Sequence, residues 1–152
     1  MAIPKVSHRV TNARVRSDGN RVRNSILLGL PADECDAVFK KLEFVELPTN
    51  FVLQEAGPIK FAYFINSGLA SVLNDENVEV GLAGKEGFIG RSLANGFNTS
   101  PRRVIMKLRG SAYRITSADF AKALIALCEL GKELESLRYA QHLAEVIYDS
   151  SR

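Results

Sequence analysis

The sequence has few of the side chains on which metal-dependent and covalent catalysis depend. It contains two histidines, His8 and His142, and neither falls in a segment with strand-like spacing. A metal-dependent barrel enzyme would need several histidine and carboxylate ligands directed into its barrel, and serine or cysteine catalysis would need a histidine beside a nucleophile motif. The sequence also has no Walker-type phosphate loop and no GxGxxG dinucleotide motif. These absences argue against an enzyme.

Cysteines and long apolar runs are scarce as well. Cys35 and Cys128 are the only cysteines, and they match neither a CxxC motif nor a metal-ligand spacing. We interpret them as buried free thiols in a reducing compartment. No segment approaches the roughly 20 apolar residues of a membrane helix, and the first residues lack the apolar core of a secretory signal. We therefore expect a cytoplasmic protein with no membrane partner.

Positive charge is concentrated at the N-terminus. Residues 1–24 carry six basic side chains against a single acidic one, Asp18, whereas the remainder carries fourteen basic and sixteen acidic residues. We expect residues 1–23 to form a basic, disordered leader. Contact of this arm with nucleic acid or an acidic partner is the alternative, and an organellar transit peptide would have a similar composition.

Residues 24–148 change from helical to strand-like spacing and back, as one domain would. Apolar residues at three- and four-residue spacing predict flanking helices over about 24–42 and 117–148. The apolar segments between them are short and are separated by Gly, Pro and Asn turns, with a tight turn expected at 66–68. These segments are 44–47, 51–53, 61–65, 69–73, 78–82, 103–108 and 112–115. Their number and spacing predict a β-sandwich or small barrel with flanking helices.

The last predicted helix, 132–148, has a stripe suited to self-association. Ser136, Ala140, Leu143 and Ile147 fall on one side of it. The small residues permit close approach of a second helix, and the large ones supply apolar surface. We therefore expect a homodimer through these four residues, with packing of the helix against its own domain as the alternative.

The segment 84–93 contains closely spaced glycines between a predicted strand and a short apolar turn. Glycines permit positive φ angles, and successive backbone N–H groups in such a loop can form an anion-binding concavity. The basic pair Arg102 and Arg103 enters the next predicted strand and could reach that loop. The candidate ligand-binding residues are therefore Gly87, Phe88, Ile89, Gly90, Arg91, Ser92, Arg102 and Arg103.

An ordered set of motifs points to a family. The motifs run LEFVELP over 42–48, GPI over 57–59, YFINSG over 63–68, VEVGL over 78–82 and EGFIG over 86–90. Together they resemble the sensor domain of bacterial transcription regulators of the cyclic-AMP-receptor and fumarate–nitrate-regulator superfamily. The resemblance covers about residues 24–148. It implies an antiparallel, jelly-roll-like β-roll with flanking helices, a phosphate-binding cassette between two strands, and a long C-terminal helix that forms a parallel dimer.

Two departures from the family pattern affect the expected function. The chain stops at Arg152, where the family continues into a winged helix-turn-helix, so we expect no direct reading of DNA by this chain alone. Either the chain is truncated or it is a free-standing sensor. In addition, the family's cassette has a glutamate that takes the ribose hydroxyl, and Arg91 stands at that position. The cassette's phosphate-binding arginine would be Arg102 or Arg103.

Three functions remain open on these grounds. The first is a regulatory ligand-sensing or signal-relay domain of a transcription regulator, with a cyclic nucleotide or another small anion as its ligand. The second is a ligand-free protein-interaction or dimerisation module. The third, a barrel enzyme, has neither metal ligands nor a catalytic base to support it.

Overall fold

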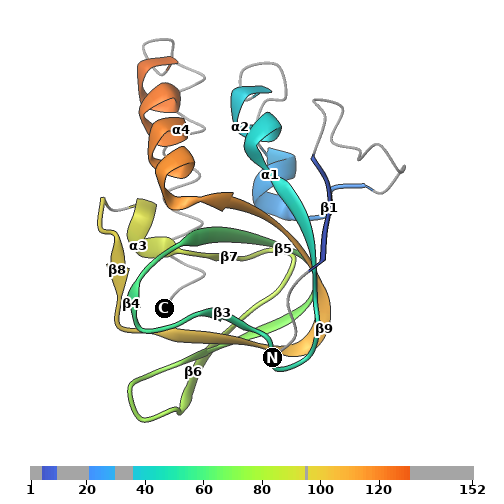
Figure 1. Ribbon diagram of the computed structural model, residues 1–152, viewed down its shortest axis with the longest axis vertical. Helices are drawn as coiled ribbons and strands as arrows, with labels where there is room; N and C mark the ends of the chain where they lie inside the picture. Colours follow the sequence, from blue (N-terminus) through green and yellow to red (C-terminus); the bar gives the residue numbers. More distant parts are fainter. Residues whose placement is uncertain (1–4, 10–20, 30–35, 95, 131–152) are drawn as a thin grey trace.

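The computed structural model describes residues 5–9, 21–29, 36–94 and 96–130. Antiparallel strands form a β-roll, and helices lie at one end of it (Figure 1), which confirms the mainly β class expected from the sequence. The helices are α1 (Ser25–Gly29), α2 (Asp36–Lys41), α3 (Arg91–Ala94) and α4 (Ser117–Leu130). The strands are β1 (Lys5–Arg9), β2 (Glu43–Leu47), β3 (Val52–Gln54), β4 (Gly57–Pro58), β5 (Phe61–Leu73), β6 (Glu79–Ala83), β7 (Phe88–Ile89), β8 (Thr99–Ser100) and β9 (Arg103–Thr116).

Two long strands, β5 and β9, form the central pair of the roll. They pair antiparallel from Phe61↔Thr116 to Leu73↔Arg103, with register shifts around residues 65–70. The sequence prediction of a tight turn at 66–68 was wrong, because the chain bends there without reversing. Gly68 has φ +84°, and a Cβ on Gly110 would overlap the Ser67 carbonyl, so the two strands cross too closely for side chains at these positions. Four predicted strands are therefore two bent ones.

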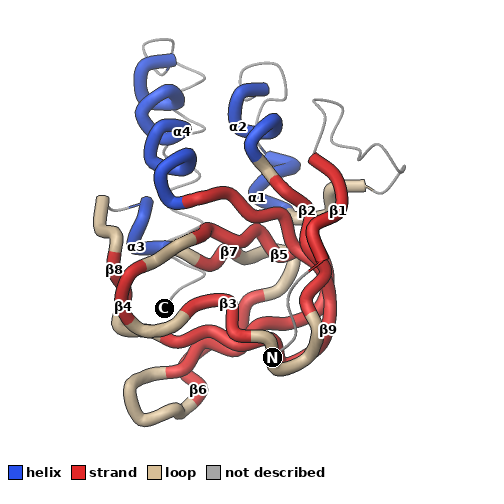
Figure 2. The backbone as a smooth tube through the Cα atoms, in the orientation of Figure 1, coloured by secondary structure: helices blue, strands red, loops and turns tan. Residues whose placement is uncertain are grey.

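The shorter strands extend this central pair. The main sheet runs β1-β2-β9-β5-β6, while β3 also pairs with β9 and β7 with β5. A separate two-stranded sheet joins β4 to β8, pairing Gly57 with Ser100 and Pro58 with Thr99. The tube in Figure 2 shows these strands curling around one another below α1, α2 and α4, with α3 at the side. The β4–β8 pair brings residues 99–102 close to β3.

Two apolar clusters fill the domain, one on each side of the bent sheet. The first packs α1, α2 and α4 against the strands, and within it the ring centroids of Phe64 and Phe88 lie 4.8 Å apart and those of Phe88 and Phe120 5.4 Å apart. The second lies inside the roll and includes Ile65, Met106 and other side chains from β2, β3, β5, β6, β7 and β9. Neighbouring residues on one strand, such as Phe64 and Ile65, thus enter different clusters, as the two-residue strand period requires.

Lys5–Arg9, within the segment predicted to be a leader, form β1 and pair with β2 at Lys5↔Glu46 and Val6↔Val45. Without this pairing β2 would present an unpaired edge, and the short β1 segment with its β-branched Val6 covers that edge.

Several sequence predictions fall outside the described residues. The dimer residues Ser136, Ala140, Leu143 and Ile147 belong to this group, as does the whole predicted helix 132–148, and so do the side chains of Cys35 and Cys128. Within the described part of the chain, no helix has both the length and the apolar character needed to span a membrane.

Candidate functional site

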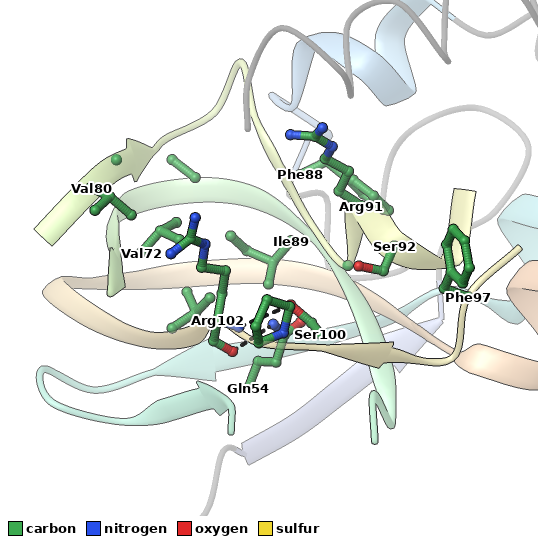
Figure 3. A pocket seen from close by; sticks show the side chains of 15 residues that line it. Gln54, Val72, Val80, Phe88, Ile89, Arg91, Ser92, Phe97, Ser100 and Arg102 are labelled. Atoms are coloured by element: carbon green, nitrogen blue, oxygen red, sulfur yellow. Dashed lines mark hydrogen bonds between the residues drawn. The ribbon is translucent and has the colours of Figure 1, made fainter. Parts of the chain in front are cut away.

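A cavity of about 340 Å³ opens between the roll and the segment that joins β7 to β9. Its volume lies within the usual range for small-molecule sites. Three parts of the chain enclose it: β5 with β6, the β7–α3 segment, and the stretch from Phe97 to Val104 with Gln54 beside it (Figure 3). The lining residues are Gln54, Val72, Val80, Gly81, Ala83, Phe88, Ile89, Gly90, Arg91, Ser92, Phe97, Ser100, Pro101, Arg102 and Val104.

Gly90 determines the direction of the chain between β7 and α3. Phe88 and Ile89 are fixed by pairing with β5, and the chain then turns at Gly90 with φ +112°, where a Cβ would lie 3.2 Å from the Cα of Ala62. Only glycine adopts this conformation without strain. The turn is closed by the Leu93 N–H, which donates to the Gly90 carbonyl at 3.0 Å.

Helix α3 follows directly but has only four residues. The macrodipole of a helix is the sum of aligned peptide dipoles, so a single turn provides little positive potential. The attraction for an anion that the sequence analysis ascribed partly to a helix start must therefore come from side chains.

The two arginines of the basic pair point to different places. Arg102 lines the cavity, and its backbone is held by the Ser100 hydroxyl, which accepts from its N–H at 3.1 Å. Arg103 does not line the cavity; its Nε donates to Glu55 Oε1 at 3.3 Å on the exposed surface. Of the two arginines that the sequence offered near the cassette, Arg102 lines the cavity and Arg103 does not.

The cavity brings together most, but not all, of the expected ligand-binding residues. Those that line it are Phe88, Ile89, Gly90, Arg91, Ser92 and Arg102. Gly87 and Arg103 do not line it. Gly87 instead closes the preceding turn, where its N–H donates to the Gly84 carbonyl at 2.8 Å.

Nine lining residues were not anticipated from the sequence. Most are apolar residues of β5, β6 and β9, which the sequence pattern does not distinguish from ordinary core residues. Gln54, Ser100 and Phe97 lie in segments with no recognisable motif. The only available signal for Gln54 was a polar residue at the end of an apolar strand. That signal is common and does not by itself mark a site.

The cavity lining is positively charged. It includes Arg91 and Arg102 but no Asp, Glu, His, Lys or Cys among the described residues that form it. In Figure 3 the Arg102 side chain extends toward Val72, whereas Arg91 extends in a direction away from Gln54 and Ser100. No group of three or more His, Cys, Asp and Glu side chains in the described ranges could hold a metal ion. The chemistry offered is that of anion binding within largely apolar walls.

Groups with shifted pKa values lie outside this cavity. Hydrogen bonds from the Ser71 hydroxyl at 2.6 Å and from Lys107 at 3.1 Å lower the pKa of the Glu79 carboxyl. Burial raises the pKa of Tyr63, and its hydrogen bond with Arg114 opposes the shift. Neither group lines the cavity, so neither supplies an acid or base to it.

No protein-family model matches the sequence, and no curated protein is significantly similar to it. Many solved structures match the fold. The C-linker/CNBHD of zELK channels, crystallised in the presence of cAMP, has a TM-score of 0.61 at 18% identity, covering 83% of this chain and 61% of that one. The chain therefore spans about three fifths of that structure's length.

Two bacterial structures are also similar. A cyclic nucleotide-binding domain from Methylobacillus flagellatus KT has a TM-score of 0.59 at 15% identity, covering 75% of this chain and 66% of that one. The sensor domain of the transcriptional regulator DNR from Pseudomonas aeruginosa has a TM-score of 0.55 at 10% identity, covering 72% of this chain and 86% of that one. The chain thus has the fold of a cyclic nucleotide-binding domain.

Proposed function

We propose that the domain is a regulatory sensor that binds a small anionic ligand in this cavity and serves a transcription regulator. The observation that carries the proposal is the position of Arg102 at the cavity, with no carboxylate of the described residues paired to its guanidinium. The cavity walls are largely apolar, and the described residues that line it carry no negative charge. An anion is the ligand that such a site favours. The similarity in fold to the DNR sensor domain supports the regulatory part of the proposal.

Paired variants of the neighbouring arginines test this function. Cyclic AMP and inorganic phosphate are titrated in turn, and binding is followed by calorimetry and by backbone amide NMR shifts. We expect an anion to bind with shifts at residues 88–92 and 100–104. Arg102→Gln should weaken it about ten- to a hundredfold, the range for a charged hydrogen bond.

Arg103→Gln is the matched control, since it removes the same charge one residue away from a side chain that pairs with Glu55. It should leave the affinity within about twofold, because it removes no cavity contact. If neither anion binds, or if both variants behave alike, the cavity is not an anion site.

We expect cyclic AMP to bind weakly in this cavity. Arg91 stands where the resembling family has a glutamate that accepts the ribose hydroxyl, and a guanidinium offers donors only. The missing acceptor should cost about 1.5–3 kcal/mol, or about ten- to a hundredfold in affinity. Micromolar binding of cyclic AMP that is lost in Arg102→Gln would show that Arg91 is tolerated and that this objection is wrong.

We also propose that the chain forms a homodimer through the helix predicted from the sequence over residues 132–148. The proposal rests on the sequence stripe that contains Ala140 and Leu143. A buried leucine contributes about 1.5–3 kcal/mol, so placing a charge there should break the contact. Ala140→Glu and Leu143→Glu should sediment as monomers, and a wild type that is monomeric at high concentration would refute the dimer.

A second candidate function is a ligand-free interaction module. It is favoured by Val78, Val80 and Leu82, which are 54%, 42% and 46% exposed on or beside β6, the strand at the edge of the main sheet. Exposed apolar edges are typical of sites where another chain docks. The titrations distinguish the two functions, because this module would bind no anion at Arg102.

A further inference from the structure

We propose that Gln54 is a specificity residue of this cavity, and that its side-chain oxygen accepts a hydrogen bond from the ligand. The inference rests on the proposed function and deepens it: the ligand is an anion that also carries a hydroxyl or amino donor. Figure 3 shows Gln54 at the base of the cavity, beneath the corner formed by Ser100 and Arg102.

The orientation of the Gln54 amide is set by its neighbour. Nε2 of Gln54 donates to the Arg102 carbonyl oxygen at 3.0 Å, so Oε1 is directed away from that carbonyl. Gln54 is the last residue of β3 and pairs with Val104 of β9, which fixes its backbone as well. The side chain is 8% exposed and therefore has little freedom to turn toward solvent.

The Oε1 atom is buried and has no hydrogen-bond partner in the described part of the chain. Leaving a buried acceptor unsatisfied is costly, and the great majority of such atoms in native proteins have a partner. Gln54 lines the cavity, so a molecule bound there can supply the missing donor. The Arg102 carbonyl accounts for the amide nitrogen, whereas no partner in the described part of the chain accounts for the oxygen.

Arg102 and Gln54 together define the ligand's chemistry. The guanidinium of Arg102 has donors only and selects a negative group, whereas Gln54 Oε1 is an acceptor and selects a donor. The hydrogen bond between Gln54 and the Arg102 carbonyl ties the two recognition elements to one backbone position. A fully deprotonated oxyanion can satisfy Arg102 but presents only lone pairs to Gln54.

Inorganic phosphate and sulfate provide the test. In weakly acidic buffer phosphate retains a hydroxyl donor, while sulfate has none and carries the greater negative charge. Coulombic attraction to Arg102 alone would therefore favour sulfate. We expect the wild type to bind phosphate about three- to tenfold more tightly than sulfate, the effect of one net hydrogen bond.

Gln54→Met keeps the length of the side chain but removes the acceptor, together with the single hydrogen bond to the Arg102 carbonyl. It should abolish the preference for phosphate, leave the sulfate affinity within about twofold, and leave the melting temperature of the free protein within about 3 °C. Gln54→Asn, which withdraws the oxygen by one methylene and keeps the amide, should give the same loss of preference and serves if the methionine variant does not fold.

The possible failures are distinguishable. If the wild type binds sulfate as tightly as phosphate, or if Gln54→Met preserves the preference, the inference is wrong while Arg102-dependent binding keeps the proposed function intact. If Gln54→Met instead weakens both anions equally and markedly lowers the melting temperature, Gln54 is a structural residue. If neither anion binds and Arg102→Gln changes nothing, the proposed function and the inference fail together.

Discussion

The side chain of Asn24 joins helix α1 to the roll, and replacing it tests how much the stability of the domain depends on that connection. Its side chain is fully buried, and Nδ2 donates to the carbonyls of Ile65 at 2.7 Å and Gly87 at 2.8 Å. Its Oδ1 accepts from the N–H groups of Ile26 at 3.1 Å and Leu27 at 3.3 Å, which caps α1. One side chain therefore connects α1, β5 and the loop that leads into β7.

Asn24→Ala would remove all four interactions. Loss of an N-cap costs about 1 kcal/mol, and each buried carbonyl left without a donor costs about 1–3 kcal/mol. Some relaxation and water entry reduce the sum, so we expect a loss of about 3–5 kcal/mol in the free energy of unfolding, measured by urea denaturation. Asn24→Ser should lie between the wild type and the alanine variant, because serine keeps the cap but cannot reach both carbonyls.

Asn74→Ala is the matched control for this series. Asn74 Oδ1 also accepts from two backbone N–H groups, those of Glu76 at 2.9 Å and Val78 at 3.0 Å, but both bonds are exposed. Water replaces the lost acceptor there, so the cost should stay below about 1 kcal/mol. If Asn24→Ala costs no more than Asn74→Ala, the buried carbonyls do not depend on Asn24 and the argument is wrong.

Two further predictions concern the rim of the cavity and the outer surface of the sheet. Gly90→Ala should destabilise the protein by about 1–3 kcal/mol more than Gly96→Ala in the same denaturation assay, because both glycines have positive φ but a Cβ on Gly90 would also crowd Ala62. Equal costs for the two variants would show that Ala62 moves aside and would refute this reasoning. The Glu79 carboxyl should titrate by NMR below its ordinary value of 4.5, and Ser71→Ala should raise that pKa. Since the folded-state pKa is depressed, the stability this contact supplies is present above pH 4.5 and is lost as the pH falls through the lower folded value; an unchanged titration in Ser71→Ala would refute the assignment.

Much of the fold could be predicted from local pattern, and the exceptions share a physical cause. The change of apolar spacing near residues 43 and 116 marks the limits of the roll, because helix and strand periods differ. The continuity of β5 through Gly68 could not be predicted in this way. A glycine after Asn and Ser is typical of a turn, and only the close crossing of β9 at Gly110 converts it into a bend. The two-residue pairing of β4 with β8 likewise depends on contacts distant in sequence.

The assignment of the basic pair shows what strand patterns can and cannot decide about a site. Alternate residues of a strand share a face, and Val104 and Met106 are both buried inside the roll. Arg102 has the same parity and lines the cavity, whereas Arg103 has the opposite parity and meets Glu55 outside. Which residues of this strand face the interior could not be predicted from the sequence, because residues 104–106 are all apolar and show no alternation. The pairing of β3 with β9 decides which residues face inward. Because Val104 faces the interior beside Gln54, the preceding arginine on that face is Arg102.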